Sequence, residues 1–353
     1  MPRSCARPFV RLALALALLG CEPRANDVTP IDARVDDARA DGASDGPPPC
    51  VLGGTMTGAP ATVACGGNAS GRVVLAGDDV LWTVQQPGGV LMKAPLVGGV
   101  PKELVRAKVG AVGLVVVDAY AYFTLPGANQ VLRVPLAGGQ AEVVTGALDF
   151  PLFVASDGAS LFVTSGQKYA GVVSKVSLDP RTANAHPPLT LMDGLPGPRG
   201  LAVADGFVYW TDVFDGALLR TADRPDDAAH DGGTRVAARL AAGLSGPSDL
   251  ALAGRYAYVA DQRGSLARIP LVGGDPELFT DARGTPYGVA TDGASLYWTT
   301  RGNPGGVFKI PLAGGAPLAL VTGEADAHFL SVGVTAVVWG TWGNGGAIRR
   351  VAK

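Results

Sequence analysis

Seven copies of one short pattern fill residues 70–353 and constrain the fold more than any other feature of the sequence. Each copy has an apolar strand-like run, a turn, an aromatic run that ends near a threonine, and a third run that usually leads into a Gly-Gly turn. The aromatic runs end at residues 83, 124, 164, 211, 260, 299 and 340, so their separations are 41, 40, 47, 49, 39 and 41 residues. This spacing, with one aromatic motif per unit, is typical of propeller blades. We therefore predict an all-β, seven-bladed β-propeller of four-stranded antiparallel blades.

The two ends of the repeat array predict how the ring closes. The final repeat stops at residue 353, after its third strand-like run, whereas residues 61–65 form a strand-like segment before the first repeat. We expect residues 61–65 to supply the missing fourth strand, because a closed ring leaves no unpaired strand edge. The propeller would then occupy residues 50–353. Its repeats lie near residues 70–106, 107–147, 148–194, 195–244, 245–283, 284–324 and 325–353.

Two segments of the repeats resemble known propeller families. Residues 209–212 read Tyr-Trp-Thr-Asp, and residues 296–312 contain another aromatic run followed by a glycine-rich turn. These segments resemble the YWTD repeats of the low-density-lipoprotein-receptor propellers, and residues 261–268 are similar to the related NHL repeats. The resemblance implies a propeller over residues 70–353. It implies no particular function, because such propellers include both binding modules and enzymes.

The first 20 residues have the pattern of an export signal. Three arginines precede the apolar run 12–19, which is too short for a membrane-spanning helix of roughly 20 residues. The segment Leu18–Cys21 resembles the lipobox of bacterial lipoproteins, which implies cleavage after residue 20 and lipidation of Cys21. An ordinary signal peptide with a chance cysteine is the alternative. Because residue 22 is Glu rather than Asp, the resemblance further implies the outer membrane, on its periplasmic or surface side.

Residues 21–49 have the composition of a disordered tether. The segment 22–50 contains three arginines and seven acidic residues, a net charge of −4, and it has few large apolar side chains. Such a segment buries too little surface to offset the entropy lost on ordering. We therefore expect an acidic, disordered linker between the lipid and the propeller.

The remaining cysteines predict a disulfide. Cys5 would leave with the signal peptide and Cys21 would carry lipid, so Cys50 and Cys65 are left in an exported chain. Metal ligation is the alternative, but two cysteines without neighbouring histidines make a poor metal site. We expect a disulfide between Cys50 and Cys65 and no metal.

Charge in the repeats favours a structural role. Residues 51–353 hold 23 basic and 24 acidic side chains, so no strong field attracts a nucleic acid. The third run carries a basic residue in every repeat: Lys93, Arg133, Lys175, Arg220, Arg268, Lys309 and Arg350. We predict that each pairs within its blade with a recurring turn aspartate (Asp79, Asp118, Asp157, Asp205 or Asp292). A cationic ring that binds an anion is the alternative.

Side chains that break the repeat at the start of a first strand indicate a ligand site. They are Phe150, Arg199, Asp249, Tyr287 and His328. Loops after the second strands add Lys168, Tyr169, Phe214, Arg263, Asn303 and Trp342. In propellers these positions surround the mouth of the central channel, so we predict a binding site there. A solvated rim without a ligand is the alternative.

No catalytic or cofactor motif stands out, so we assign no catalytic residue and expect no cofactor. The sequence favours a monomeric binding or scaffolding module for a protein or small ligand at the cell envelope. The alternative is a propeller enzyme that resembles gluconolactonases or streptogramin lyases. Those resemblances imply a Glu, Asn and Asp cage or a His and Glu set at the inner rim. Here Glu103, Glu142 and Glu277 lie around outer strands, Glu324 lies in a loop, and His328 alone is well placed.

Overall fold

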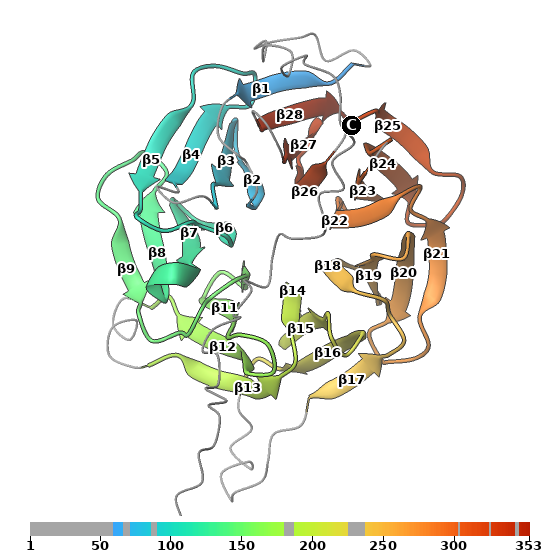
Figure 1. Cartoon of the computed structure of the whole chain (residues 1–353), viewed down its shortest axis with the longest axis horizontal. Coiled ribbons are helices and arrows are strands. Elements are labelled where there is room, and N and C mark those ends of the chain that lie inside the picture. Colours follow the sequence, from blue (N-terminus) through green and yellow to red (C-terminus); the bar gives the residue numbers. More distant parts are fainter. Residues whose placement is uncertain are drawn as a thin grey trace, which may run out of the picture. The chain divides into compact units, whose positions relative to one another are not determined.

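The computed structural model describes residues 59–65, 71–85, 90–179, 187–224, 237–302, 304–324, 326–342 and 346–353. All of them belong to one compact unit, Ala43–Lys353. In this unit seven four-stranded antiparallel sheets surround a common centre (Figure 1), which confirms the predicted seven-bladed propeller. The signal peptide, the tether, Cys21 and Cys50 lie outside the described residues. None of the helices in the described part is both long and apolar enough to cross a bilayer.

Each blade runs from an inner first strand to an outer fourth strand (Figure 1). The first strands are β2 (Val73–Ala76), β6 (Leu114–Val117), β10 (Val154–Ser156), β14 (Pro198–Ala204), β18 (Pro247–Ala253), β22 (Thr285–Thr291) and β26 (Ala327–Val332). The second strands are β3 (Asp79–Thr83), β7 (Tyr120–Leu125), β11 (Ser160–Ser165), β15 (Phe207–Asp212), β19 (Tyr256–Asp261), β23 (Ser295–Arg301) and β27 (Ala336–Thr341).

The outer half of each blade completes the sheet. The third strands are β4 (Val90–Pro95), β8 (Gln130–Pro135), β12 (Gly171–Ser177), β16 (Ala217–Ala222), β20 (Ser265–Pro270), β24 (Gly306–Pro311) and β28 (Ala347–Ala352). The fourth strands are β5 (Lys102–Arg106), β9 (Glu142–Thr145), β13 (Leu189–Leu195), β17 (Ala238–Ala241), β21 (Glu277–Asp281), β25 (Leu318–Thr322) and β1 (Ala61–Cys65). A short 3₁₀ helix, η1 (Pro126–Ala128), follows β7.

The ring closes through β1, as predicted. β1 pairs antiparallel with β28, and the register joins Ala61 to Arg350 and Cys65 to Ala347. Val63 is fully buried between the first and last blades, in a cluster with Trp82 and Ile348. The last blade therefore combines strands from both ends of the propeller, and β28 has a partner strand on its outer side as the other third strands have.

The recurring threonine at the end of the second strand joins neighbouring blades. The Thr83 hydroxyl donates to the Val112 carbonyl at 2.8 Å, and the Thr124 hydroxyl donates to the Leu152 carbonyl at 2.7 Å. The fifth blade has Ala260 at this position, and there the Ser248 hydroxyl donates to the carbonyl of Tyr287 in the next blade at 3.0 Å. The recurring threonine thus reflects a hydrogen bond from the second strand of one blade to the backbone next to the first strand of the following blade.

The recurring basic residue of the third strand also joins neighbouring blades, so the predicted uniform intrablade pairs are wrong. Among the described residues one pair follows the prediction in full, with Lys93 Nζ 2.6 Å from Asp79 Oδ2. Arg133 and Arg268 also pair within their blades, but with the fourth-strand residues Glu142 and Glu277, at 2.7 and 2.6 Å. Four basic side chains, Lys93 among them, donate to a carbonyl in the loop that follows the third strand of the next blade. These bonds are Lys93 to Leu136, Lys175 to Asp223, Arg220 to Leu271 and Arg350 to Val97. A backbone carbonyl is present whatever the neighbouring loop sequence, whereas a carboxylate is not.

Candidate functional site

One residue of each blade occupies the same position at the start of the first strand, directly before the residue that pairs with the buried aromatic run. By the strand register these residues are Arg72, Gly113, Phe153, Gly200, Asp249, Gly288 and Phe329. A Cβ atom at Gly288 would lie 2.9 Å from the Cα of Phe329, so the inner strands approach too closely there for any larger residue. The four large side chains of this set fill the centre of the ring.

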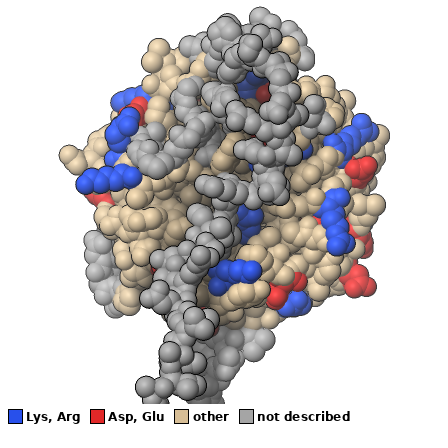
Figure 2. All heavy atoms as spheres, in the orientation of Figure 1, with Lys and Arg blue, Asp and Glu red and all other residues tan. Residues whose placement is uncertain are grey.

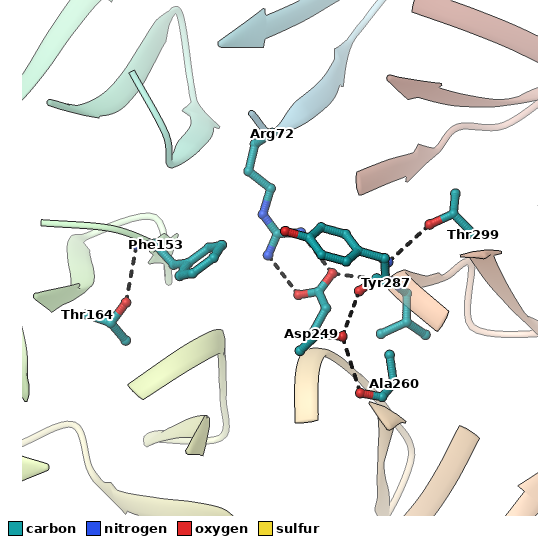
Figure 3. A network of polar contacts seen from close by, with 10 residues as sticks. Arg72, Phe153, Thr164, Asp249, Ala260, Tyr287 and Thr299 are labelled. Carbon is teal, nitrogen blue, oxygen red and sulfur yellow. Dashed lines mark hydrogen bonds and ion pairs between the residues drawn. The ribbon is translucent and has the colours of Figure 1, made fainter. Parts of the chain in front are cut away.

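Arg72 and Asp249 form an ion pair across the channel. Arg72 lies before β2 of the first blade and Asp249 lies in β18 of the fifth, and their side chains point toward one another (Figure 3). Arg72 Nη1 is 2.9 Å from Asp249 Oδ2, and Nη2 is 2.8 Å from Oδ1, which is a bidentate geometry. The Val289 N–H also donates to Asp249 Oδ2, at 3.2 Å. Asp249 is only 1% exposed, so its carboxylate is fully engaged inside the protein.

Aromatic rings flank this ion pair. The Cζ atom of Arg72 lies 4.3 Å from the ring centroid of Phe329 and 5.6 Å from that of Phe153. The two phenylalanine rings are themselves 5.8 Å apart in an edge-to-face arrangement. The guanidinium group of Arg72 therefore binds a carboxylate through its N–H edge and lies close to two aromatic rings. Both contacts stabilise the positive charge where little water reaches it.

Tyr287 and His328 lie beside each other next to the ion pair. Their ring centroids are 4.4 Å apart, and the ring of Trp342 lies 5.0 Å from that of His328. Tyr287 is 5% exposed and His328 is 1% exposed. Arg301 covers the tyrosine, with its Cζ 5.1 Å from the ring centroid. These side chains belong to the packed interior of the inner strands.

The predicted site residues thus fall into two groups. Asp249, Tyr287 and His328 lie on the neighbouring inner strands β18, β22 and β26 and are buried. Arg199 is half-buried at the start of β14, and Phe150 is half-buried in the loop before β10, where its N–H donates to Asn129 Oδ1 at 2.9 Å. Asn303 lies outside the described residues.

Arg72, Phe153 and Phe329 were missed by the sequence reasoning. They share the position of Asp249 in their own blades, so aligning the repeats residue by residue at the first strand would have found them. An arginine and an aspartate at equivalent positions of different blades are a readable signal for a pair across a ring. Of the predicted residues, Arg199, Tyr287 and His328 stand one position before the equivalent residue of their blade and Phe150 stands three before it, which hid that equivalence.

Lys168, Tyr169 and Phe214 form an exposed cluster on the same end of the blades, which we call the aromatic platform. Tyr169 is 66% exposed and Phe214 is 41% exposed, and their ring centroids are 5.9 Å apart. Lys168 Nζ lies 5.1 Å from the first ring centroid and 4.9 Å from the second. The cluster joins the loop between β11 and β12 to the loop between β15 and β16.

The backbone beneath the aromatic platform holds both rings in place. The Tyr169 N–H donates to the Pro196 carbonyl at 2.8 Å. At the next residue, a Cβ atom on Gly197 would lie 2.4 Å from the Phe214 ring, so the glycine lets that ring lie against the chain. Asp212, the last residue of the Tyr-Trp-Thr-Asp segment, accepts hydrogen bonds from the N–H groups of Gly197 at 3.0 Å and Phe214 at 3.1 Å. The platform is therefore preorganised.

The described charged side chains form no single dominant patch on the face drawn in Figure 2. On the face drawn in Figure 2, basic and acidic side chains are interspersed at the outer edge of the described surface. Within the described ranges no three His, Cys, Asp or Glu side chains gather closely enough to hold a metal ion. Burial raises the pKa of Glu324, and Arg349, whose Nη2 is 3.5 Å from Oε2, counteracts part of that effect.

Comparisons with known proteins support the fold. No family model and no curated protein matches the chain. Among solved structures, the virginiamycin B lyase of Staphylococcus aureus is 12% identical, with a TM-score of 0.63 over 84% of this chain and 99% of the lyase. A puromycin-hydrolyzing peptidase of Mycobacterium tuberculosis is 16% identical, with a TM-score of 0.58 over 85% of this chain and 55% of the peptidase. At these identities the likeness shows the propeller fold alone.

Proposed function

We propose that this protein is a binding module of the bacterial cell envelope, and that its propeller captures a ligand or partner on the end of the blades that carries the channel mouth. The engaged state of Asp249 is the observation that supports binding over catalysis. Both of its oxygens accept hydrogen bonds from Arg72, and the carboxylate is buried. An acid or base at the inner rim has to reach its substrate, so Asp249 is poorly suited to that role.

The surface available for binding is the rim around that mouth. The strands are antiparallel, so the starts of the first strands and the ends of the second strands lie at the same end of each blade. This end carries the half-buried Phe150 and Arg199, the exposed Arg263 and the aromatic platform. Tyr287 and His328 support the rim from beneath, and a ligand would contact them after side chains above them move.

The proposed location at the cell envelope depends on the N-terminal sequence. Cys21 in the lipobox-like segment would carry lipid, the acidic residues 22–49 would act as a spacer, and a disulfide between Cys50 and Cys65 would fix the start of β1. The Tyr-Trp-Thr-Asp segment in β15 supports kinship with YWTD propellers. Replacing Cys21 with Ser should move the protein from the membrane fraction to the soluble fraction. Retention of this variant in the membrane would contradict lipid anchoring.

A propeller enzyme is the second candidate function. One of the matching lyase structures is a catalytically inactive histidine-to-alanine variant with quinupristin bound, and its TM-score to this chain is 0.63. The present chain has a histidine, His328, on an inner strand. His328 is 1% exposed and lies against Tyr287 and Trp342, so catalysis would require the ring to become accessible.

A charge-reversal experiment tests the proposed binding face. The purified mature protein is immobilised and exposed to envelope extract, and the captured components are identified by mass spectrometry. The double variant Arg199→Glu and Arg263→Glu should lose a component that the wild type retains. Arg255→Glu, at the exposed turn between β18 and β19 on the opposite end of the blades, should retain it. Loss with Arg255→Glu and retention with the double variant would assign binding to the opposite face.

A further inference from the structure

Tyr169 adopts a backbone conformation that is unfavourable for its side chain. Its φ angle is +64°, in the left-handed region that strains residues with a Cβ atom. In the equivalent loops of other blades, the residue with positive φ is Gly216, Gly264 or Asn129, all of which tolerate this conformation. Because the Tyr169 side chain is 66% exposed, burial in the core does not compensate for the strain. The strain at this exposed tyrosine therefore points to a role outside folding.

The two rings of the aromatic platform offer a shallow, exposed apolar surface. Phe214 rests against the backbone at Gly197, and the backbone of Tyr169 is anchored through its N–H to the Pro196 carbonyl, so the two loops that carry the rings are held next to each other. Their planes are inclined by 35°. A shallow surface of this kind suits the C–H face of a sugar ring, because the ring hydrogens meet the π electrons while the hydroxyl groups stay in water.

Lys168 adds a positive charge to the same surface. Its ammonium group lies within 5.1 Å of both ring centroids and makes no ion pair with any acidic side chain among the described residues. The rings hold the ammonium on one side and leave its other side open to an anion. A ligand that combines a carboxylate with a sugar ring would satisfy both features.

We propose that the aromatic platform binds an acidic carbohydrate of the uronic acid type. The size of the platform favours a short glycan over a protein surface, because three side chains cover far less than the roughly 800 Å² that each partner contributes to a standard protein interface. This inference deepens the binding function proposed above and depends on it for the face that is used. It adds the class of ligand and the side chains that recognise it.

Calorimetric titration of the whole mature protein with galacturonic acid tetramer tests the proposal. The wild type should bind, and Lys168→Met and Tyr169→Ala should each weaken the affinity about tenfold or more, because one loses the charge and the other a ring. The matched control is Arg255→Met on the opposite end of the blades, where Arg255 Cζ lies 5.2 Å from the Tyr256 ring centroid. This control removes an equivalent cation near a ring and should bind like the wild type. Thermal melts of each variant verify folding.

Three results would overturn the proposal. Absence of binding by the wild type is the first, and equal affinity for the neutral galactose tetramer is the second. The third is binding of a glutamate peptide of the same charge in place of the tetramer, which would identify a protein segment as the occupant. If the tetramer fails while the Arg199→Glu and Arg263→Glu variant still loses its envelope component, the glycan proposal is wrong and the proposed binding function stands.

Discussion

In both the channel centre and the aromatic platform a cation lies beside aromatic rings, but the two regions differ in what that cation pairs with. In the channel, Arg72 lies near the rings of Phe153 and Phe329, and on the platform Lys168 lies near two exposed rings. Arg72 also has a buried carboxylate partner, Asp249, whereas Lys168 pairs with no acidic side chain in the described part of the chain. In the channel the protein itself supplies the anion that the cation needs, whereas on the platform the charge of Lys168 stays available to a ligand.

The two regions also differ in how strongly the fold depends on them. The ion pair joins the first blade to the fifth, and both oxygens of its carboxylate are removed from water. Such a pair stabilises the folded state no more than apolar side chains of similar size would. Losing one partner, however, leaves the other charge buried without compensation. The platform lies on two loops and shields little of the core. Removing the channel ion pair should therefore change stability, and removing side chains of the aromatic platform should change binding.

The largest expected effect is that of Arg72→Ala. Asp249 would remain buried without its partner, which costs about 3–5 kcal/mol of unfolding free energy. Urea unfolding at pH 7 measures this loss. Glycan binding at the aromatic platform should remain unchanged once the protein is folded. A loss below about 1 kcal/mol would show that the channel pair is not coupled to folding.

A double variant separates the lost ion pair from the lost packing. Arg72→Ala combined with Asp249→Ala removes both charges, so it should be more stable than Arg72→Ala alone although it lacks more atoms. The coupling between the two substitutions then measures the burial of an unpaired carboxylate. If the double variant is less stable than either single variant, the ion pair itself has little influence and packing dominates.

Gly288→Ala should have the next largest effect. The added methyl carbon would lie 2.9 Å from Phe329 Cα and 3.1 Å from the His328 carbonyl oxygen, both of which are backbone atoms that cannot move aside easily. Forcing an atom into such a contact costs roughly 1–3 kcal/mol. Thermal melting should show a lower Tm. Gly293→Ala, at an open turn with no atom near the new Cβ but with a φ of +84°, separates this steric effect from backbone strain.

The repeats made most of the fold predictable. The aromatic runs, the truncated last repeat and the strand-like residues 61–65 predicted seven blades and the closing strand, because each of these features recurs or is missing at a fixed spacing. The recurring basic residues were predicted to pair within blades, and the sequence could not reveal that four of them donate to a backbone carbonyl of the next blade. Every residue has a backbone carbonyl group, so the residue types do not show which carbonyl accepts a hydrogen bond.

The candidate site was predictable only in part. Asp249 was found because it breaks the repeat, but its burial depends on Arg72, which is 177 positions away along the chain. Contacts across a ring join blades that are not neighbours, so local patterns do not report them. Tyr169 and Phe214 were easier to place, because the repeat spacing puts both in loops after the second strands, and there they are exposed.

Tyr169→Gly should raise stability slightly while it removes binding. Glycine adopts a φ of +64° without strain, which favours the folded state by about 1 kcal/mol, although part of this gain is offset by the greater freedom of glycine in the unfolded chain. Urea unfolding and calorimetric titration on one preparation measure both effects. A clear loss of stability would show that the tyrosine serves the fold, which would contradict a role confined to binding.

The smallest expected effect is that of Asp292→Asn, at the turn between β22 and β23, which lies outside both the channel and the platform. Burial by itself raises the pKa of Asp292, but hydrogen bonds from Lys353, Ser295, Ala294 and Tyr297 outweigh it and leave the pKa well below its usual range. A carboxylate with a lowered folded-state pKa stabilises the protein above its unfolded pKa of about 3.9, and this contribution is lost as the pH falls below that value. Asp292→Asn should therefore cost about 1 kcal/mol at pH 7, and the difference from the wild type should shrink when urea unfolding is repeated near pH 3. An equal difference at both pH values would mean that the carboxylate acts through packing rather than through its charge.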